Sequence, residues 1–160
     1  MQKTRRKCKQ CGEWHILPPS KLKTWSGFCN RGCKLNWNQN NISWLGDKCD
    51  KEFSKLVREK GFCEKCGARS IKMDCSHVIP RGNKTLRWDI LNALCLCHRC
   101  HRFWAHGNPL DFTDWFSNKF PHRYDYLMET RNKITKPNVP HLQGIRKAIR
   151  NKDLKKLINE

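Results

Sequence analysis

The sequence predicts a small α+β protein built from two cysteine-rich modules, with amphipathic helices between and after them. Three observations support this fold class. The chain has 160 residues, which suits one compact domain with appendages or two very small domains. Eight of its 11 cysteines fall into two sets of closely spaced pairs. Apolar residues recur at helical spacing between and after these sets.

The composition points to a polyanionic partner and to metal. The chain carries 33 Lys and Arg against 14 Asp and Glu, a formal net charge of +19, which favours nucleic acid. An odd count of 11 cysteines would leave one thiol over in a disulfide scaffold and favours metal binding. No apolar run approaches the roughly 18–20 residues that cross a bilayer, and no apolar segment follows the basic N-terminus. We therefore expect a cytoplasmic protein with no membrane partner.

Residues 1–35 form the first module. Cys8-x2-Cys11 is followed after 17 residues by Cys29-x3-Cys33. Two such pairs bring four thiolates to one tetrahedral point, which suits a structural zinc ion with no open coordination position. This segment has too few apolar residues to build a core alone, so a metal staple would be needed. Disulfides or free thiols are the alternative interpretation.

Residues 36–61 are predicted to be a polar linker, 36–47, followed by a helix, 48–60. Asp47 is a suitable N-cap, and Gly61 stands where a helix-ending glycine belongs. One apolar stripe lies on this helix, and we interpret it as core packing. The stripe consists of Cys49, Phe53, Leu56 and Val57.

Residues 110–160 are predicted to be helical and, toward their end, basic. A first helix follows Pro109, and Pro121 suits the first turn of a second. One or two short basic amphipathic helices are expected near the C-terminus. We expect the basic ends of the chain to contact nucleic acid and the more acidic stretch 110–130 to pack. The stripe of the first helix consists of Phe112, Trp115, Phe116 and Phe120.

Residues 62–109 form the second module, which carries a more specific pattern. Its metal ligands are Cys63-x2-Cys66 and, after 30 residues, Cys97-x2-Cys100, again a four-thiolate zinc pattern. Between and after these pairs stand three residues with characteristic spacing. They are His77 on a strand before Val-Ile-Pro, Asn92 five residues before the second pair, and His101 directly after it.

This pattern resembles the HNH nuclease motif over about residues 62–108. The resemblance implies a ββα-metal (His-Me finger) fold in which the second zinc ion staples the two ends. The N-terminal module ahead of it, with Asp74 three residues before His77, also resembles the phage NinG/Rap family of recombination proteins. These resemblances imply a metal-dependent DNA endonuclease that nicks or cuts branched or structured DNA in phage recombination or replication, in the host cytoplasm.

The chemistry assigns a role to each residue. His77 is the expected general base, because the unperturbed pKa of histidine lies near working pH. Asn92 would fix the backbone and orient His77 through a hydrogen bond. One Mg²⁺ or Mn²⁺ ion would neutralise the phosphate and the leaving oxygen. His101 and Asp74 are the candidate ligands of this catalytic ion, beside the two structural zinc ions.

The sequence departs from the HNH pattern at Ser76. Many HNH enzymes place a metal-binding Asp or His directly before the general base. Because side chains alternate along a strand, Asp74 and Ser76 share a face, and Asp74 can take the ligand role. His98 and His106 are spare candidates. NinG-like proteins place their helix histidine slightly later than the position after the second cysteine pair, which keeps His106 as a candidate.

Basic residues crowd the stretch after His77 and are predicted to contact DNA phosphates without reading sequence. A solvated basic rim is the alternative. These residues are Arg81, Lys84, Arg87, Arg99 and Arg102. The remaining cysteines, Cys49, Cys75 and Cys95, are predicted to be core thiols, and Trp88 and Trp104 to pack.

Three other functions stay open on the sequence. One is a homing or restriction-type HNH nuclease that reads sequence, and another is a non-catalytic zinc-finger accessory protein that binds DNA. The third is an RNA-directed nuclease, since the basic arms fit RNA as well. Resolving a four-way junction would need a two-fold homodimer, whereas a nickase can act as a monomer.

Overall fold

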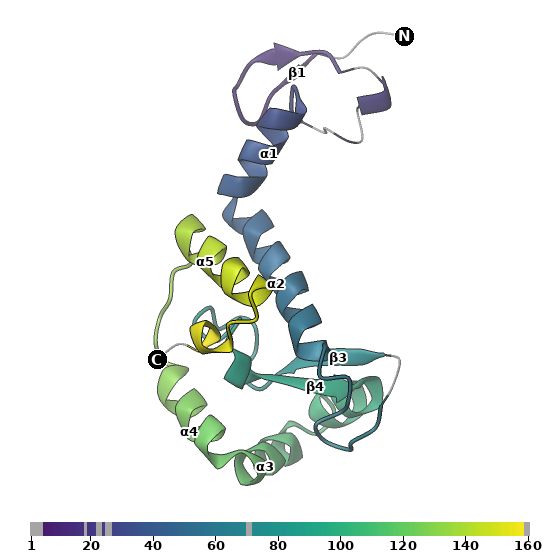
Figure 1. Cartoon of the computed structure of the whole chain (residues 1–160), viewed down its shortest axis with the longest axis vertical. Helices are drawn as coiled ribbons and strands as arrows, with labels where there is room; N and C mark the ends of the chain where they lie inside the picture. The colour runs from purple at the N-terminus through teal and green to yellow at the C-terminus, as the bar shows by residue number, and fades with distance from the viewer. Residues whose placement is uncertain (1–4, 18, 22–23, 25–26, 70–71, 159–160) are drawn as a thin grey trace. The chain divides into compact units, whose positions relative to one another are not determined.

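The computed structural model describes residues 5–17, 19–21, 24, 27–69 and 72–158. It is a small α+β protein with two two-stranded antiparallel sheets and several helices (Figure 1). The chain divides into two compact units, Met1–Leu45 and Gly46–Glu160. Among the described residues, no helix is both long and apolar enough to cross a membrane.

The first unit is a small hairpin followed by helices. Strands β1 (Arg6–Lys7) and β2 (Trp14–His15) pair antiparallel, and a 3₁₀ turn, η1 (Pro19–Lys21), follows. Helix α1 (Arg31–Asn40) begins at Asn30, whose side chain accepts a hydrogen bond from the Cys33 backbone N–H at 2.8 Å. Few apolar side chains are buried here, as the sequence predicted. Among the described residues of this unit they are Cys8, Leu17, Phe28 and, in the helix that follows α1, Leu45.

The prediction of a linker over 36–47 is wrong. Helix α1 continues to Asn40, and α2 runs over Ile42–Arg58. The break is at Asn41, whose backbone is extended and whose side chain accepts from the Trp44 N–H at 2.8 Å, so that Asn41 caps α2 in place of Asp47. Polar residues had suggested a linker, but they are the exposed side of helices. The buried row of α2 begins before residue 48: it consists of Leu45, Cys49, Phe53 and Val57.

The second unit is built around a buried hairpin. Strand β3 (Met73–His77) pairs antiparallel with β4 (Ala93–Cys97), in a register from Met73↔Cys97 to His77↔Ala93. Every residue of β4 is buried. A short 3₁₀ turn, η2 (Ile90–Asn92), precedes β4, and a π-helix, η3 (Cys100–Ala105), follows it.

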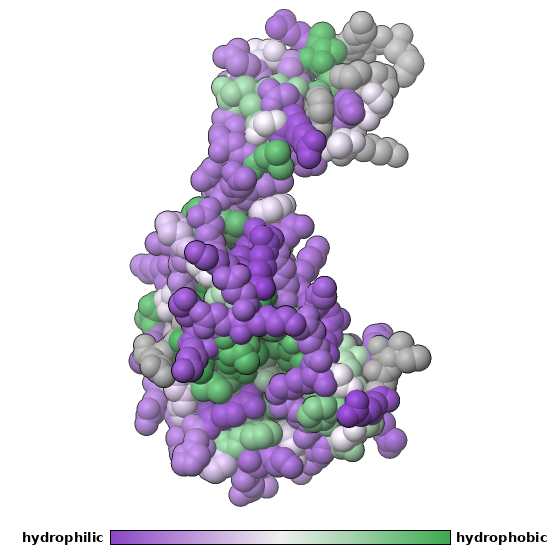
Figure 2. All heavy atoms as spheres, viewed as in Figure 1, coloured by the Kyte–Doolittle hydropathy of each residue, from purple (hydrophilic) through white to green (hydrophobic). Residues whose placement is uncertain are grey.

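The predicted C-terminal helices are confirmed. They are α3 (Pro109–Lys119), α4 (Pro121–Thr130) and α5 (Val139–Arg150), followed by the 3₁₀ turn η4 (Leu154–Leu157). Proline occupies the first turn of α3 and of α4, where its missing N–H costs nothing. Helix α5 lies beside α2 (Figure 1), tied to it by ion pairs between Glu52 and Arg146. Figure 2 shows apolar residues gathered toward the middle of this unit, bordered by hydrophilic ones.

Candidate functional site

The two predicted cysteine tetrads are both assembled. Within each, the four sulfur atoms lie within 4.8 Å of one another, and none of the cysteines forms a disulfide. Measured sulfur–sulfur distances are 3.6 Å (Cys11–Cys29), 3.4 Å (Cys29–Cys33) and 3.9 Å (Cys66–Cys97). Four thiolates about 2.3 Å from a tetrahedral zinc ion would be about 3.8 Å apart, whereas a disulfide would need about 2.0 Å. Both tetrads therefore fit zinc.

Backbone donors prepare these thiols for metal. In each knuckle a glycine with positive φ, Gly12 (75°) or Gly67 (73°), turns the chain back on the first cysteine. Burial raises the pKa of Cys8, but hydrogen bonds from backbone N–H groups outweigh it and lower the pKa to about 6. The same balance lowers the pKa of Cys63 to about 7. A zinc ion held by four thiolates would have no open position, so it would staple the fold and supply no hydrolytic chemistry.

His77 stands at the end of β3, and one of its two ring nitrogens is hydrogen-bonded to the backbone. Its Nε2 lies 3.0 Å from the Arg87 carbonyl oxygen. A carbonyl only accepts, so Nε2 carries the hydrogen and the neutral ring keeps its lone pair on Nδ1. The described residues provide no partner for Nδ1. Burial lowers the pKa of His77, which keeps the ring neutral near pH 7 and makes Nδ1 a competent general base.

Helix α2 forms one wall of the space beside His77. The ring of Phe53 lies 6.0 Å from the imidazole, centroid to centroid. A small pocket of about 40 Å³ adjoins His77, with room for water but not for a nucleotide. Its other lining residues are Asp50, Ser54, Cys75 and Arg81.

Asn92 holds the loop that carries Arg87, whose carbonyl oxygen contacts the His77 ring. Its side chain is fully buried and forms three hydrogen bonds to backbone. Oδ1 accepts from the Ile79 N–H at 2.7 Å, and Nδ2 donates to the carbonyls of Ile79 at 3.0 Å and Leu86 at 2.9 Å. It thus fixes the backbone as expected, but its bonds go to Ile79 and Leu86 and not to His77. Asn92 is a positioning residue that acts through this loop.

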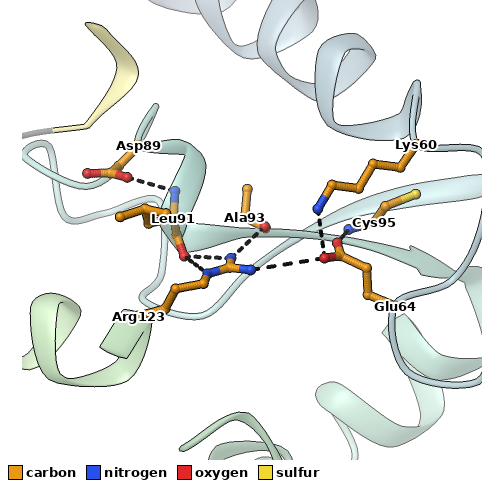
Figure 3. Close-up of polar contacts among 7 residues, drawn as sticks. All are labelled: Lys60, Glu64, Asp89, Leu91, Ala93, Cys95 and Arg123. Carbon is orange, nitrogen blue, oxygen red and sulfur yellow. Dashed lines mark hydrogen bonds and ion pairs between the residues drawn. The ribbon is translucent and has the colours of Figure 1, made fainter. Parts of the chain in front are cut away.

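A half-buried arginine of α4 binds the backbone of the two residues next to Asn92, Leu91 and Ala93 (Figure 3). Arg123 donates to the carbonyl of Leu91 at 2.9 and 2.6 Å and to that of Ala93 at 3.0 Å, the two carbonyls on either side of Asn92. Its guanidinium also lies 4.0 Å from Glu64, which accepts from the Cys95 N–H at 2.7 Å. Because Glu64 lies between two zinc ligands, this network ties α4, β4 and the second tetrad together.

Asp74 contacts two histidines near the π-helix, and a third histidine contacts one of these two. Its Oδ2 lies 3.0 Å from Nδ1 of His98 and 3.1 Å from Nδ1 of His101. The Nε2 atoms of His101 and His106 are 3.1 Å apart, because the π-helical bond from the His106 N–H to the His101 carbonyl brings these residues onto one face. The four side chains form a chain of contacts. Among the described residues, only the cysteine tetrads place three or more ligand atoms within 4.8 Å of one another.

The strand separates His77 from the Asp74 group. Asp74 contacts His98 and His101, whereas Cys75 and His77 line the pocket against α2. Alternation along β3 thus directs the two sets to different faces. Ser76, on the Asp74 face, is 3% exposed.

The basic residues differ in their freedom to bind phosphate. Arg87 forms two hydrogen bonds to Asp50, at 2.9 and 2.5 Å, and Trp88 Nε1 donates to the same carboxylate at 2.8 Å. We therefore assign Arg87 a structural role in place of the predicted phosphate contact. The other four predicted contacts are exposed. They are Arg81, Lys84, Arg99 and Arg102.

No protein-family model, curated protein or solved structure matches this chain. Function is therefore argued from the residues and their geometry.

Sequence reasoning missed two positioning residues. Asp50 belongs to the polar side of α2, and the sequence pattern of this helix predicts only its apolar stripe. Arg123 stands in the acidic stretch 110–130. Its only signal in the sequence is that it is a basic residue among acidic ones. Both act across more than 30 positions of sequence, from Asp50 to Arg87 and from Arg123 to Leu91, and no local pattern encodes such contacts.

Proposed function

We propose that this protein is a metal-dependent DNA endonuclease of the HNH, ββα-metal type, with His77 as general base. The observation that carries the proposal is the state of the His77 ring, with Nε2–H tied to the Arg87 carbonyl and a lone pair on Nδ1. This ring stands on a hairpin next to a zinc-type tetrad, with Asn92 holding the connecting loop.

In the proposed reaction, Nδ1 of His77 takes a proton from a water molecule in the adjoining pocket. The resulting hydroxide attacks phosphorus, and the bond from phosphorus to the 3′ oxygen breaks. The leaving 3′ oxygen takes a proton from solvent water and His77 returns its proton to solvent, which gives a 5′-phosphate and a 3′-hydroxyl. A general base of this kind contributes about 10²–10⁴ in rate.

The Asp74 group supplies the ligands for a divalent ion. Asp74 and His101 would hold it, with His106 and His98 as further donors. One carboxylate with imidazoles suits Mn²⁺ better than Mg²⁺, which prefers oxygen ligands. When bound, such an ion would neutralise negative charge on a phosphate that contacts the Asp74 group. Since Asp74 and His77 face different sides of β3, the experiment tests the base and the ligands separately.

The substrate part of the proposal is branched or structured DNA, cut in phage recombination or replication in the host cytoplasm. It is supported by the resemblance to NinG/Rap proteins, which is an argument by analogy. Cutting both strands of a junction would require two copies of the chain around a two-fold axis.

The test is cleavage of linear, nicked, flap, D-loop and four-way DNA with Mn²⁺ or Mg²⁺. We expect wild type to cut at least one branched substrate, and His77→Ala to lose about 100-fold or more in rate. Asp74→Ala and His101→Ala should raise the Mn²⁺ concentration needed for half-maximal rate. His122→Ala is the matched control, because His122 is exposed on α4. Zinc content confirms that each variant is folded.

The alternatives predict different results. Cutting of one linear site and of no branched DNA would indicate a sequence-reading enzyme. Preference for matched RNA would indicate an RNA nuclease. Absence of cutting on every substrate, or full activity of His77→Ala, would overturn the proposal and favour a DNA-binding accessory protein.

A further inference from the structure

Helix α2 carries charges on two sides, and on one side they are satisfied. Toward α5, Glu52 accepts from Arg146 at 2.7 Å and from Arg150 at 2.8 Å. Glu59 pairs with Lys152 at 2.8 Å. Each of these carboxylates has a cationic partner, so this side of α2 is an internal contact.

The other side of α2 lines an open groove of about 400 Å³. Lys51, Ser54 and Arg58 recur at i, i+3 and i+7, so they form one stripe along the helix. Arg81 faces them from the connection between β3 and β4. The groove is completed by Asp47 and Asp50.

The cations of this groove outnumber its carboxylates, three to two, and one of the two carboxylates, Asp50, is shared with Arg87 outside the groove. Within the described part of the chain, Lys51 has no hydrogen-bond or ion-pair partner, and Arg58 donates only from Nε to the Ser54 carbonyl at 3.0 Å. The Arg81 side chain is 64% exposed, and its nearest carboxylate oxygen is 4.0 Å away, on Asp50. Asp50 already accepts two hydrogen bonds from Arg87. The positive charge is therefore available to an anion.

The groove opens onto the His77 pocket. The two share three lining residues, Asp50, Ser54 and Arg81. The pocket has room for water beside His77, and the groove is ten times larger in volume, at about 400 Å³ against about 40 Å³. An anionic chain lying in the groove would thus bring a phosphate next to that water.

We infer that this groove is the track of the DNA sugar–phosphate backbone that leads to His77, with Lys51, Arg58 and Arg81 contacting phosphates. The Ser54 hydroxyl is a further donor to the same backbone. The inference deepens the proposed nuclease function and rests on it, since it gives the path of the substrate to the same site. The opposite interpretation is that the groove binds a cation through its carboxylates. Asp50 already accepts two hydrogen bonds from Arg87, however, and Asp47 alone does not form a cation site.

The test is DNA binding by Lys51→Ala and Arg58→Ala, measured by fluorescence anisotropy from 50 to 200 mM salt without added Mn²⁺ or Mg²⁺. The matched control is Lys55→Ala, which removes the same charge from the same helix but from the side that faces α5. Each groove contact should contribute about 0.9 to the slope of log affinity against log salt. Across this salt range, the affinity of each variant should therefore fall about 3.5-fold less than that of wild type. The slope for Lys55→Ala should stay at the wild-type value. Arg58→Lys keeps the positive charge, so it should retain most of the slope that Arg58→Ala loses.

Cleavage assays separate the inference from the proposed function. If wild type cuts DNA while both groove variants keep the wild-type slope, the inference is wrong and the nuclease stands. An equal loss in Lys55→Ala would also overturn it, because the effect would then be one of net charge. If the groove variants lose slope and wild type cuts nothing, the groove is supported as a DNA-binding surface and the nuclease proposal fails. His77→Ala should bind like wild type.

Discussion

The buried amide of Asn92 offers the sharpest test of how the site is held. Asn92→Ala would remove all three hydrogen bonds to Ile79 and Leu86. The Ile79 N–H and carbonyl would lose these partners, whereas the Leu86 carbonyl would keep only its bond from the Asp89 N–H at 3.3 Å. Counting about 1 kcal/mol for each lost bond predicts a loss of about 3 kcal/mol.

Such a loss is a large share of the stability of a small domain, typically about 5–15 kcal/mol. With a urea m-value of about 2 kcal/mol per molar, the midpoint of unfolding should fall by about 1.5 M. Unfolding is followed by tryptophan fluorescence of the zinc-loaded protein, since Trp88 is buried beside this loop. Hydrogen exchange should show loss of protection at the Ile79 amide, which donates to Asn92.

Two further variants make the test specific. Asn92→Asp keeps the acceptor for the Ile79 N–H but sets a carboxylate against two carbonyl oxygens, so it should be at least as destabilising at pH 7. Asn118→Ala is the matched control: Asn118 is exposed and bonds within α3, and its loss should cost less than about 0.5 kcal/mol. A loss below about 1 kcal/mol in Asn92→Ala would refute the assignment of Asn92 as the residue that holds this loop.

Three other measurements follow from the same structure. Hydrogen bonds from Arg146 above all, and then from Arg150, lower the pKa of Glu52 to about 2. The stabilising effect of Glu52 is therefore complete above about pH 4.5 and is lost as the pH falls toward 2. Glu52→Gln should make the free energy of unfolding depend less on pH over that range, and an unchanged acid transition would contradict the ion pair. The zinc-loaded chain should hold two metal ions by atomic spectroscopy, and Cys97→Ala should lower the number to one; a chain holding two ions after the substitution would disprove the ligand set. Burial raises the pKa of Cys49 to about 12, so this thiol should resist alkylation at pH 8 until the protein is unfolded, as read by mass spectrometry.

Features set by short sequence spacing could be predicted. The four-thiolate sites follow from cysteine pairs with two or three residues between their members, and the structure assembles both. The proline-led helices α3 and α4 follow from local caps and apolar periodicity. The linker prediction failed because polar composition reports exposure and not the absence of a helix, and Asn41 shows that one capping residue suffices to separate two helices.

Features set by contacts between distant segments could not be predicted. Arg87 and Arg81 are alike in sequence, yet Asp50, 37 residues before Arg87, takes one into a structural ion pair and leaves the other 64% exposed. The face of Asp74 could be predicted from strand alternation, and the structure places it against His98 and His101. The π-helix that brings His106 to His101 has no signal in the spacing of these histidines.

The site also extends beyond the segment whose sequence pattern suggested it. That segment begins at residue 62, but much of what surrounds the His77 ring comes from α2, earlier in the chain: Phe53 packs on the ring, and Asp50 anchors the loop residue whose carbonyl accepts from Nε2. Without α2, Arg87 would lose its carboxylate partner, and its carbonyl would no longer be fixed opposite His77. The tautomer that leaves Nδ1 with its lone pair therefore depends on helix packing as well as on the hairpin. A chain cut at residue 62 would keep both halves of the second tetrad but lose the wall that orients the base.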